Sequence, residues 1–328
     1  MERSRSSIVI AGQGIAGSML AWACERAGIA FRIFDPGHAK AASRVAAGLV
    51  SPLTGQRLVP TWRFSEWRDP VLAIYREMET ELGVPIVREL RIERRFRNTR
   101  QRELFCSRIE RPEVAPWVES VGHHALILRG AFQVDTGVLI ARLRERWRQR
   151  GELQNSTVPT ALDGETETII WCTGAVPPPG LSIPWEPSRG EIVRGELAGL
   201  AHDTVLNDGQ WVLPMNGTEV IVGALFDRDD LTVGVTTVGQ AELMAAAERL
   251  TGRSLTAARG DSGIRVNVPD RRPVAGWADT RQRVGVLGSL AAKGALWAPM
   301  LAQQWCADGL AGDQLDPAVR VARFPGAV

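Results

Sequence analysis

The first residues with a recognisable chemical use are three glycines at the spacing GxGxxG. Gly12, Gly14 and Gly17 follow the apolar run 7–11 and open a segment of helical periodicity. In that context Gly12 allows a tight turn, Gly14 lets backbone N–H groups approach a pyrophosphate, and Gly17 lets the helix pack on the strand. Asp35 lies 23 residues after Gly12 at the end of the next apolar run, where a carboxylate accepts hydrogen bonds from ribose hydroxyls. The combination predicts a dinucleotide-binding βαβ unit, with NAD and FAD both open.

A run of small residues follows that unit. The segment 41–52, AASRVAAGLVSP, leaves room for a bulky ligand close to the backbone. Its pattern resembles the second motif of the D-amino-acid oxidase superfamily of FAD enzymes, which includes glycine oxidase and sarcosine oxidase. The turn CTG at 172–174, the stretch 261–276 and the glycine motif at 287–302 resemble later motifs of the same family. The last motif is also similar to that of the FAD oxidase half of a bifunctional tRNA wobble-uridine modification enzyme.

The resemblance implies FAD as the cofactor and assigns its contacts. The first glycine motif and Asp35 would hold the ADP half, Val158 would lie beside the adenine, and residues 288–296 would flank the isoalloxazine. Non-covalent binding is expected, because Arg44 and Ala292 stand where relatives carry the Cys or His that tethers the flavin. The residues assigned to FAD are Gly12, Gly14, Ile15, Ala16, Gly17, Asp35, Ser43, Ala46, Ala47, Gly48, Val158, Thr173, Gly174, Gly288, Lys293, Gly294, Ala295 and Leu296.

Two basic residues are the predicted catalytic residues. Arg265 is the arginine of a GxR sequence that resembles the family's, and Lys293 directly precedes Gly294 in the last motif. Lys40 and Lys293 are the only lysines among 39 basic residues, which makes a lysine in the flavin motif notable. A compact ammonium beside the flavin N1–C2=O edge, at the positive end of a helix, would stabilise anionic reduced flavin and raise its potential. The alternative is a solvent-facing lysine in a turn.

The substrate remains open at this point. Glycine oxidase-like sequences carry an arginine for the substrate carboxylate two residues before the last glycine, where this chain has Ala292. The only tyrosine is Tyr75, so tryptophans are candidates for the pocket, against the alternative that each belongs to the core. The pocket candidates are Trp62, Trp211 and Trp277.

The leading hypothesis for the reaction is hydride transfer to the flavin from the carbon beside an amine, giving an imine that hydrolyses. O2 or another electron acceptor would reoxidise the flavin. Oxidation of a 2-hydroxy acid ranks lower, since it favours a histidine base and all four histidines lie outside the flavin motifs. A flavin-binding subunit without turnover is the alternative from another class, because fold alone does not separate these activities.

The elements that position these residues alternate along the chain. Apolar runs predict strands at 30–34, 168–172 and 284–288, and helical periodicity covers 65–82, 135–150, 239–250 and the segment from 294 to 310. Prolines between 177 and 190 indicate a crossing between two lobes, and short β-like runs from 190 to 226 predict an antiparallel sheet. The predicted fold is α/β: a Rossmann-like FAD-binding lobe (glutathione-reductase-type βαβ; 1–75, 131–185 and 263–328), with an interleaved α+β substrate lobe (76–130 and 186–262) containing a mainly antiparallel sheet.

The amino-acid composition limits the classes of molecule that the protein is expected to bind. The 328 residues include 39 basic and 37 acidic side chains, a formal net charge of +2, and 45% of them are hydrophobic. Such a chain forms globular lobes and supplies no strong field for nucleic acid or a membrane. We therefore expect a small-molecule substrate, no membrane partner and no general nucleic-acid binding, and leave the oligomeric state open.

Several remaining features favour structural roles. The four cysteines are widely spaced without a C-x-x-C pair, which favours the reducing cytoplasm over a disulfide framework or a metal site. The first apolar run is too short for a signal peptide, and the length favours a small stand-alone oxidase. His123 and His124 read as a loop pair. Nine arginines between 88 and 111 are interspersed with glutamates, which predicts a solvated, salt-bridged surface.

Overall fold

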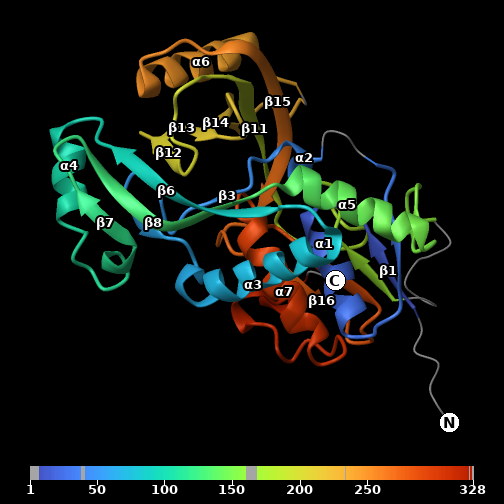
Figure 1. Cartoon of the computed structure of the whole chain (residues 1–328). Coiled ribbons are helices and arrows are strands. Elements are labelled where there is room, and N and C mark those ends of the chain that lie inside the picture. The colour runs from blue at the N-terminus through green and yellow to red at the C-terminus, as the bar shows by residue number, and fades with distance from the viewer. Residues whose placement is uncertain (1–6, 38–40, 160–167, 233, 325, 327–328) are drawn as a thin grey trace.

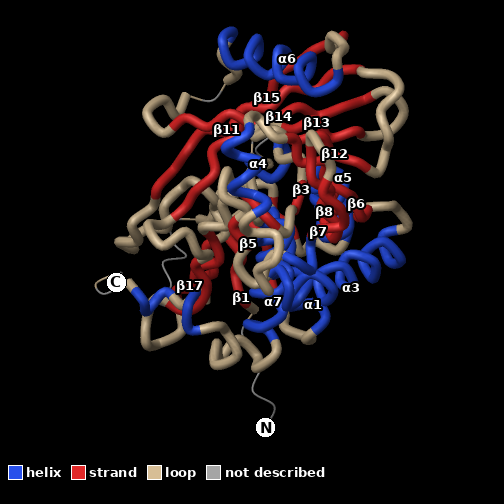
Figure 2. The backbone as a smooth tube through the Cα atoms, turned by 90° about the vertical axis from the view of Figure 1, so that its left-hand side faces the viewer, coloured by secondary structure: helices blue, strands red, loops and turns tan. Residues whose placement is uncertain are grey.

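Two sheets organise the computed structural model, which describes residues 7–37, 41–159, 168–232, 234–324 and 326. A six-stranded sheet lies in the lower half of Figure 1, and a nine-stranded sheet lies above it. Figure 2 shows helix α6 over the upper sheet, at the opposite end of the molecule from α1, α3 and α7. The α/β architecture with a mainly antiparallel second sheet confirms the predicted fold class.

The six-stranded sheet is parallel except at one edge. Its order is β16-β17-β10-β1-β2-β9, and within the described part of the chain only β16 runs antiparallel to its neighbour. The residues of β1 are all buried, as expected for a strand covered on both faces. The bounds are Ile8–Ala11 (β1), Phe31–Phe34 (β2), Leu153–Gln154 (β9), Ile169–Trp171 (β10), Val274–Trp277 (β16) and Val284–Gly288 (β17).

Helices pack around this sheet and are joined by specific polar contacts. The Tyr75 hydroxyl in α3 donates to the Ala295 carbonyl in α7 at 2.9 Å. Glu25 at the end of α1 accepts from Arg146 at 2.5 Å and from the Trp147 indole at 3.3 Å, both in α5. These contacts fix the helices that carry the first and last glycine motifs. The bounds are Ile15–Arg26 (α1), Ala42–Val45 (α2), Phe64–Leu82 (α3), Thr136–Gln149 (α5) and Gly294–Cys306 (α7).

The nine-stranded sheet has the order β15-β11-β14-β13-β12-β6-β8-β3, with β7 paired to β8. Its neighbours are antiparallel except β12 and β6. A separate hairpin, β4 with β5, extends from the segment after β3. The strand bounds are Leu49–Val50 (β3), Leu53–Thr54 (β4), Val59–Pro60 (β5), Val87–Arg95 (β6), Val118–Val121 (β7), Ala125–Val134 (β8), Glu186–Glu196 (β11), Thr204–Asn207 (β12), Trp211–Pro214 (β13), Glu219–Asp227 (β14) and Thr256–Asn267 (β15), and the helices are Thr99–Cys106 (α4) and Thr237–Thr251 (α6).

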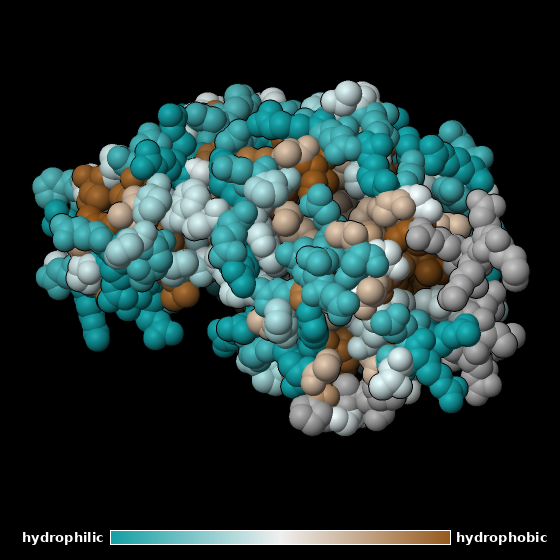
Figure 3. Space-filling model, turned by 90° about the horizontal axis from the view of Figure 1, so that it is seen from below, coloured by the Kyte–Doolittle hydropathy of each residue, from teal (hydrophilic) through white to brown (hydrophobic). Residues whose placement is uncertain are grey.

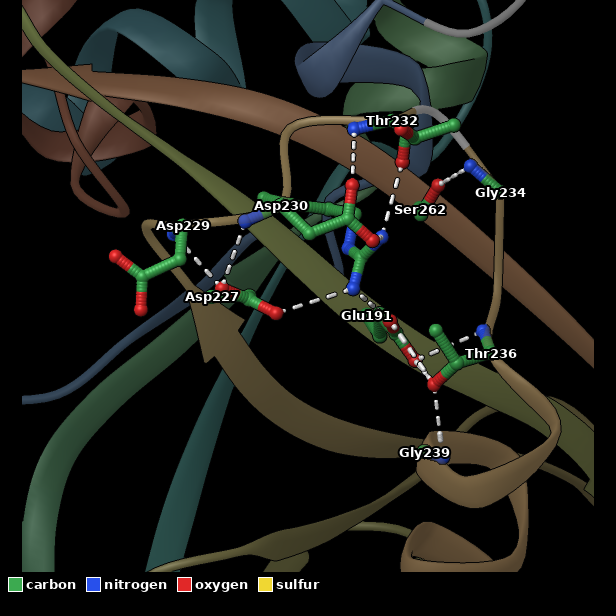
Figure 4. A network of polar contacts seen from close by, with 10 residues as sticks. Glu191, Asp227, Asp229, Asp230, Thr232, Gly234, Thr236, Gly239 and Ser262 are labelled. Carbon is green, nitrogen blue, oxygen red and sulfur yellow. Dashed lines mark hydrogen bonds and ion pairs between the residues drawn. The ribbon is translucent and has the colours of Figure 1, made fainter.

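A buried charge network fastens α6 and the loop before it to the sheet (Figure 4). Arg189 in β11 is 4% exposed and lies 3.1 Å from Glu191, 3.3 Å from Asp227 and 2.6 Å from Asp230. The Thr236 hydroxyl, which accepts from the Gly239 N–H and caps α6, also contacts the Glu191 carboxylate. Three carboxylates around one guanidinium offset the cost of burying that charge.

Two strands cross the predicted segment boundaries. β8 includes residues on both sides of the boundary at 130/131, and β15 does the same at 262/263, because each is a long strand that continues within the nine-stranded sheet. The proline-rich crossing also ends earlier than expected. Pro187 lies inside β11, at a point where that strand pairs with β15 but not yet with β14, and prolines are tolerated in strands beside such an unpaired edge.

Three further findings concern predicted absences. Within the described residues no helix has the length and apolar character to cross a membrane. The same residues hold no group of three or more His, Cys, Asp or Glu able to hold a metal ion. All four cysteines are free, although Cys24 of α1 and Cys306 of α7 are both buried, with their sulfur atoms 3.6 Å apart.

Candidate active site

The first glycine motif forms a close strand-to-helix turn. Gly12 has φ +96°, and a Cβ there would lie 2.8 Å from the Cys172 carbonyl oxygen. A Cβ on Gly17 would lie 1.9 Å from the Gly12 carbonyl oxygen, so α1 begins directly against the turn. Both positions therefore require glycine, as the GxGxxG spacing predicts.

Asp35 closes this unit at the end of β2. Its carboxylate accepts from the Gln13 N–H at 2.7 Å and from Arg144 of α5 at 2.8 Å, and it is 8% exposed. Arg144 also donates to the side chains of Gln13 and Asn155. Arg144 was not predicted from the sequence, because it stands on a helix face without a motif and 109 residues from Asp35.

The N-terminus of α1 fits a phosphate group. The helix has no acidic residue in its first turn and no side-chain cap from Gly14. Among the described residues other than its chain neighbours, the Ser43 hydroxyl oxygen is the only heavy atom within 4 Å of a Cβ built on Gly14, and it accepts from the Ile15 N–H at 3.0 Å. Ser43 in α2 thus stands beside the positive helix end, as the resemblance implies for a residue along the pyrophosphate.

The rest of the second motif is held against β8 and α5. Gly48 has φ +68°, and a Cβ there would lie 1.8 Å from the Val134 carbonyl oxygen, so only glycine fits. The carbonyl oxygens of Ala46 and Ala47 accept from Thr136 and Gln133, respectively. The segment that would line FAD is therefore fixed through its backbone, and the Ala47 side chain is buried in the apolar core.

Three other predicted FAD residues lie near the carboxyl end of the six-stranded sheet. Val158 is half-buried on the apolar cluster that includes Val9, Ala11 and Phe34. Thr173 donates its hydroxyl proton to the Val176 carbonyl, and Gly174 has φ +61° with open space where a side chain would stand. The carboxyl ends of parallel strands are where dinucleotides bind in such sheets.

The last motif turns sharply between β17 and α7. Ser289 and Ala291, which follow Gly288, both have positive φ, 53° and 49°, a strained conformation for residues with side chains. A Cβ on Gly294 would lie 2.8 Å from Ile15 Cγ2, so the starts of α7 and α1 touch. Ala295 and Leu296 are buried in the core, and the Leu296 N–H donates to the Lys293 carbonyl. Leu296 therefore serves the core and the helix start.

A cavity of about 580 Å³ opens beside the first turn of α7. The β4–β5 hairpin forms one wall, and aromatic and basic residues form the other. The Trp297 indole donates to the Trp62 carbonyl at 3.2 Å, and the two rings meet edge to face with centroids 5.9 Å apart. The lining residues are Thr54, Gly55, Gln56, Arg57, Val59, Pro60, Thr61, Trp62, Asp270, Arg271, Arg272, Lys293 and Trp297.

Both predicted catalytic residues lie in one electropositive region. Lys293 is half-buried in this cavity, and burial together with repulsion from Arg265 lowers its pKa to about 8. Arg265 donates to the Ser188 hydroxyl at 2.9 Å and stacks 3.5 Å from the centre of the Phe226 ring. Burial, followed by repulsion from Arg228, lowers the pKa of Arg265 to about 10. Positive charge thus gathers where the last motif begins.

The structure places the three tryptophans differently. Trp62 lines the cavity. Trp211 in β13 packs on the apolar interior of the nine-stranded sheet, with its ring over Gly223. Trp277 meets Trp305 edge to face at 5.2 Å and donates to the Leu310 carbonyl, because β16 is a sheet edge under the end of α7. Neither Trp211 nor Trp277 lines this cavity. Trp297, Arg271, Arg272 and the hairpin, which sequence reasoning missed, take their place.

Residues 7–308 match the sequence model of the DAO family, described as FAD dependent oxidoreductase. The chain belongs to this family. The match confirms the resemblance to the D-amino-acid oxidase superfamily that the glycine motifs indicated, and the cofactor is FAD. The glycine turn, the open start of α1 and Ser43 are consistent with that cofactor.

Relatives of this DAO-family chain include the tRNA 5-methylaminomethyl-2-thiouridine biosynthesis bifunctional protein MnmC of Maricaulis maris (strain MCS10). The two are 29% identical over 326 residues, which cover 93% of this chain and 52% of that protein. The chain thus spans about half the length of this curated relative.

Solved structures share the fold. Glycine oxidase from Geobacillus kaustophilus superimposes with a TM-score of 0.75 at 19% identity, covering 91% of this chain and 92% of that one. Iminodiacetate oxidase from Chelativorans sp. BNC1 gives a TM-score of 0.77 at 20% identity, covering 98% and 96%. At these identities the likeness establishes the fold of the DAO-family chain.

Proposed function

We propose that the protein oxidises a C–N bond in a small amine or amino acid, giving an imine that water hydrolyses. The observation that carries the proposal is the cavity at the start of α7, where Trp62 and Trp297 meet Lys293 and Arg272. Aromatic walls with a few convergent charges are typical of sites for small organic substrates. Glycine oxidase and iminodiacetate oxidase, which share the fold, act on compounds of this class by their names.

The residues of the chain would bind and orient the substrate. Lys293, Arg271 and Arg272 would attract an anionic group, and the two indoles would bury its carbon chain. Asp270 is the only carboxylate among the described lining residues, and it is already paired with Arg323 at 2.9 Å. FAD, when bound, supplies the acceptor for two electrons and a proton in the form of hydride. The substrate would give up its other proton to solvent before that transfer.

The rival reactions have less support. Oxidation of a 2-hydroxy acid favours a histidine base, and among the histidines that the structure describes, His123, His124 and His202, none lines the cavity. A flavin-binding subunit without turnover needs no substrate cavity. This protein has a cavity, and the last glycine motif forms part of its border. The MnmC name adds one compound to test, because a methylaminomethyl group is a secondary amine.

Anaerobic titration of the FAD-bound protein with a panel of compounds tests the proposal. The panel contains primary and secondary amines, amino acids, 2-hydroxy acids and 5-methylaminomethyl-2-thiouridine. Bleaching of the flavin absorbance by at least one amine or amino acid, and by no 2-hydroxy acid, is the expected result. Bleaching by hydroxy acids alone, or by none of the compounds, contradicts it. Admitting air after reduction then distinguishes O2 from another electron acceptor by the speed of reoxidation.

A further inference from the structure

A second cavity, of about 250 Å³, adjoins the first. Gly55 and Gln56, at the tip of the β4–β5 hairpin, line both cavities. Two arginines line the second cavity, and none of its lining residues is acidic. The arginine-rich stretch was expected to form a solvated surface, and Arg94 departs from that expectation because β6 lies between β8 and β12 in the sheet. The lining residues are Gly55, Gln56, Arg94, Arg97, Gly209, Gln210 and Ala224.

Arg94 is a buried cation that has only neutral partners. It is 7% exposed, and it donates to the Asn207 side-chain oxygen at 2.5 Å and to the Gly55 carbonyl at 2.9 Å. Its Nε is buried without a hydrogen-bond partner, and the described part of the chain places no carboxylate within 4 Å of its guanidinium. A guanidinium buried in this way leaves both a donor and a charge uncompensated. A structural role for Arg94 in joining β12 to the β4–β5 hairpin explains the hydrogen bonds of its Nη1 and Nη2. It does not explain the unpaired Nε or the buried charge.

A second guanidinium adds to this charge. Arg97 lies against Gly209, where a Cβ would stand 2.3 Å from its Nη2. The nearest acid, Asp208, is bound by Arg249 at 2.7 Å and lies 3.9 Å from Arg97. Burial and repulsion from Arg97 lower the pKa of Arg94 to about 10, against the opposing attraction of Asp208, so Arg94 stays charged at neutral pH. Three arginines thus stand against two carboxylates, Asp208 and, beside Arg249, Glu242, and positive charge is in excess.

We propose that this cavity is an anion subsite, in which Arg94 and Arg97 bind an oxyanion group at the end of the substrate remote from its amine. The proposal rests on the proposed amine oxidation, and it narrows the substrate to an amine with a distal carboxylate or phosphate. The planar guanidinium fork matches both groups. Gly55 and Gln56 would line the path between this group and the cavity that contains Lys293.

Calorimetric titration of the FAD-bound protein with inorganic phosphate and, separately, with acetate tests the subsite directly. Arg97→Gln removes the more accessible cation, and Arg100→Gln is the matched control, because Arg100 is exposed on the same stretch but lines neither cavity. We expect the Arg97→Gln variant to bind the preferred anion about ten- to a hundredfold more weakly, and the control to bind it as wild type does. Binding that is equal in all three proteins, or no binding of either anion, overturns the subsite. The two probes show whether phosphate or carboxylate is preferred.

A kinetic arm tests the link to the substrate. Three N-methyl amines of equal length, ending in carboxylate, phosphate or methyl, are compared by flavin reduction. A terminal oxyanion should lower KM about ten- to a hundredfold in wild type and in the Arg100→Gln control, and Arg97→Gln should abolish that advantage through KM rather than kcat. The conservative variant Arg94→Lys keeps the positive charge but loses the planar guanidinium. It should retain part of the KM advantage of the terminal oxyanion. An advantage that survives Arg97→Gln overturns the proposal.

The two proposals fail in different ways. If no amine reduces the flavin, the proposed amine oxidation is wrong, and so is the role of the subsite in binding the substrate. Calorimetry alone then decides whether the anion site exists. If amines reduce the flavin without preference for a terminal oxyanion, amine oxidation stands and the subsite is refuted.

Discussion

Gly294, the first residue of α7, lies against Ile15, the first residue of α1, so closely that a Cβ on the glycine would come within 2.8 Å of Ile15 Cγ2. The first and last glycine motifs, some 280 residues apart in the sequence, therefore meet at two helix N-termini. Both helix starts direct their positive ends to the same region. The contact links the start of α1, where the pyrophosphate is expected, to the cavity that contains Lys293.

Gly294→Ala should weaken FAD binding. The added methyl group would push α7 from α1 because the branched Ile15 side chain has no flexible end to move aside, and overpacking of this kind costs about 1–3 kcal/mol. Fluorescence titration of the FAD-free protein measures the affinity. Gly137→Ala is the control, since a Cβ at that helix start meets only the Asp135 carboxylate at an ordinary 3.4 Å. Equal affinity in both variants would show that this approach is not needed for FAD.

Bound FAD should be non-covalent, as the Arg44 and Ala292 positions imply. Cys172 and Cys306 are also unsuited to a covalent bond, because burial raises the pKa of the Cys172 thiol above its usual range and Cys306 is buried against Cys24. Acid precipitation should release all the yellow colour into the supernatant. Flavin that stays on the protein pellet would contradict this prediction.

Local patterns predicted the parts of the fold that depend on local chemistry. Gly12 and Gly17 are recognisable because a tight turn and a close helix approach each exclude a side chain, and those requirements are met within a few residues. Asp135, at the start of the helix predicted over 135–150, is a residue type that commonly caps helices, and its carboxylate accepts from the Val138 N–H. These signals need no knowledge of the remainder of the chain.

Contacts between distant segments were not predicted, because they depend on parts of the chain that a local pattern does not include. Arg94 is one of nine similar arginines in the sequence, and only the order β12-β6-β8 buries it. The sequence does not show which of Trp277 and Trp297 lines a pocket. In the structure Trp277 packs against Trp305 at the sheet edge, and Trp297 lines the cavity. Side-chain type gives little information where strand order determines the environment.

Glu25→Gln should destabilise the fold in a pH-dependent way. Burial raises the pKa of Glu25, but hydrogen bonds from Arg146, Arg150 and Trp147 outweigh it and hold the pKa below its usual value. A lowered pKa in the folded state means that this stabilisation is complete above the unfolded pKa and disappears as pH falls through the folded one. We expect a loss of about 1–2 kcal/mol at pH 7, reduced by solvent screening.

Thermal melts of the wild type and Glu25→Gln at about pH 7 and about pH 3 check this expectation, and the difference between the two proteins should shrink at the lower pH. Glu145→Gln serves as the control, because Glu145 makes only exposed contacts with Arg148 and Gln149 on the same helix. If the two proteins differ in melting temperature by the same amount at both pH values, the effect of Glu25 is due to packing and not to its charge.

Lys293→Met should lower the midpoint potential of the bound flavin. The ammonium group stands at the start of α7 beside the last glycine motif, and positive charge there favours the anionic reduced cofactor. The variant should also slow flavin reduction by substrate, while FAD remains bound through the first glycine motif. Potentiometric titration measures the change. Wild-type potential and reduction rate in the variant would make Lys293 an ordinary cavity residue.

The charge of Lys293 should also set how anions bind near the flavin as pH changes. Burial and repulsion from Arg265 lower the pKa of Lys293 to about 8, so its ammonium is deprotonated as pH rises through that value, well before an ordinary lysine. A carboxylate that binds beside it should therefore bind more weakly above about pH 8. Acetate titrations followed through the flavin absorbance spectrum report this cavity and not the one at Arg94. The affinity in Lys293→Met should be lower and independent of pH between about 7 and 9. A decline with pH that persists in the variant would place the titrating group elsewhere.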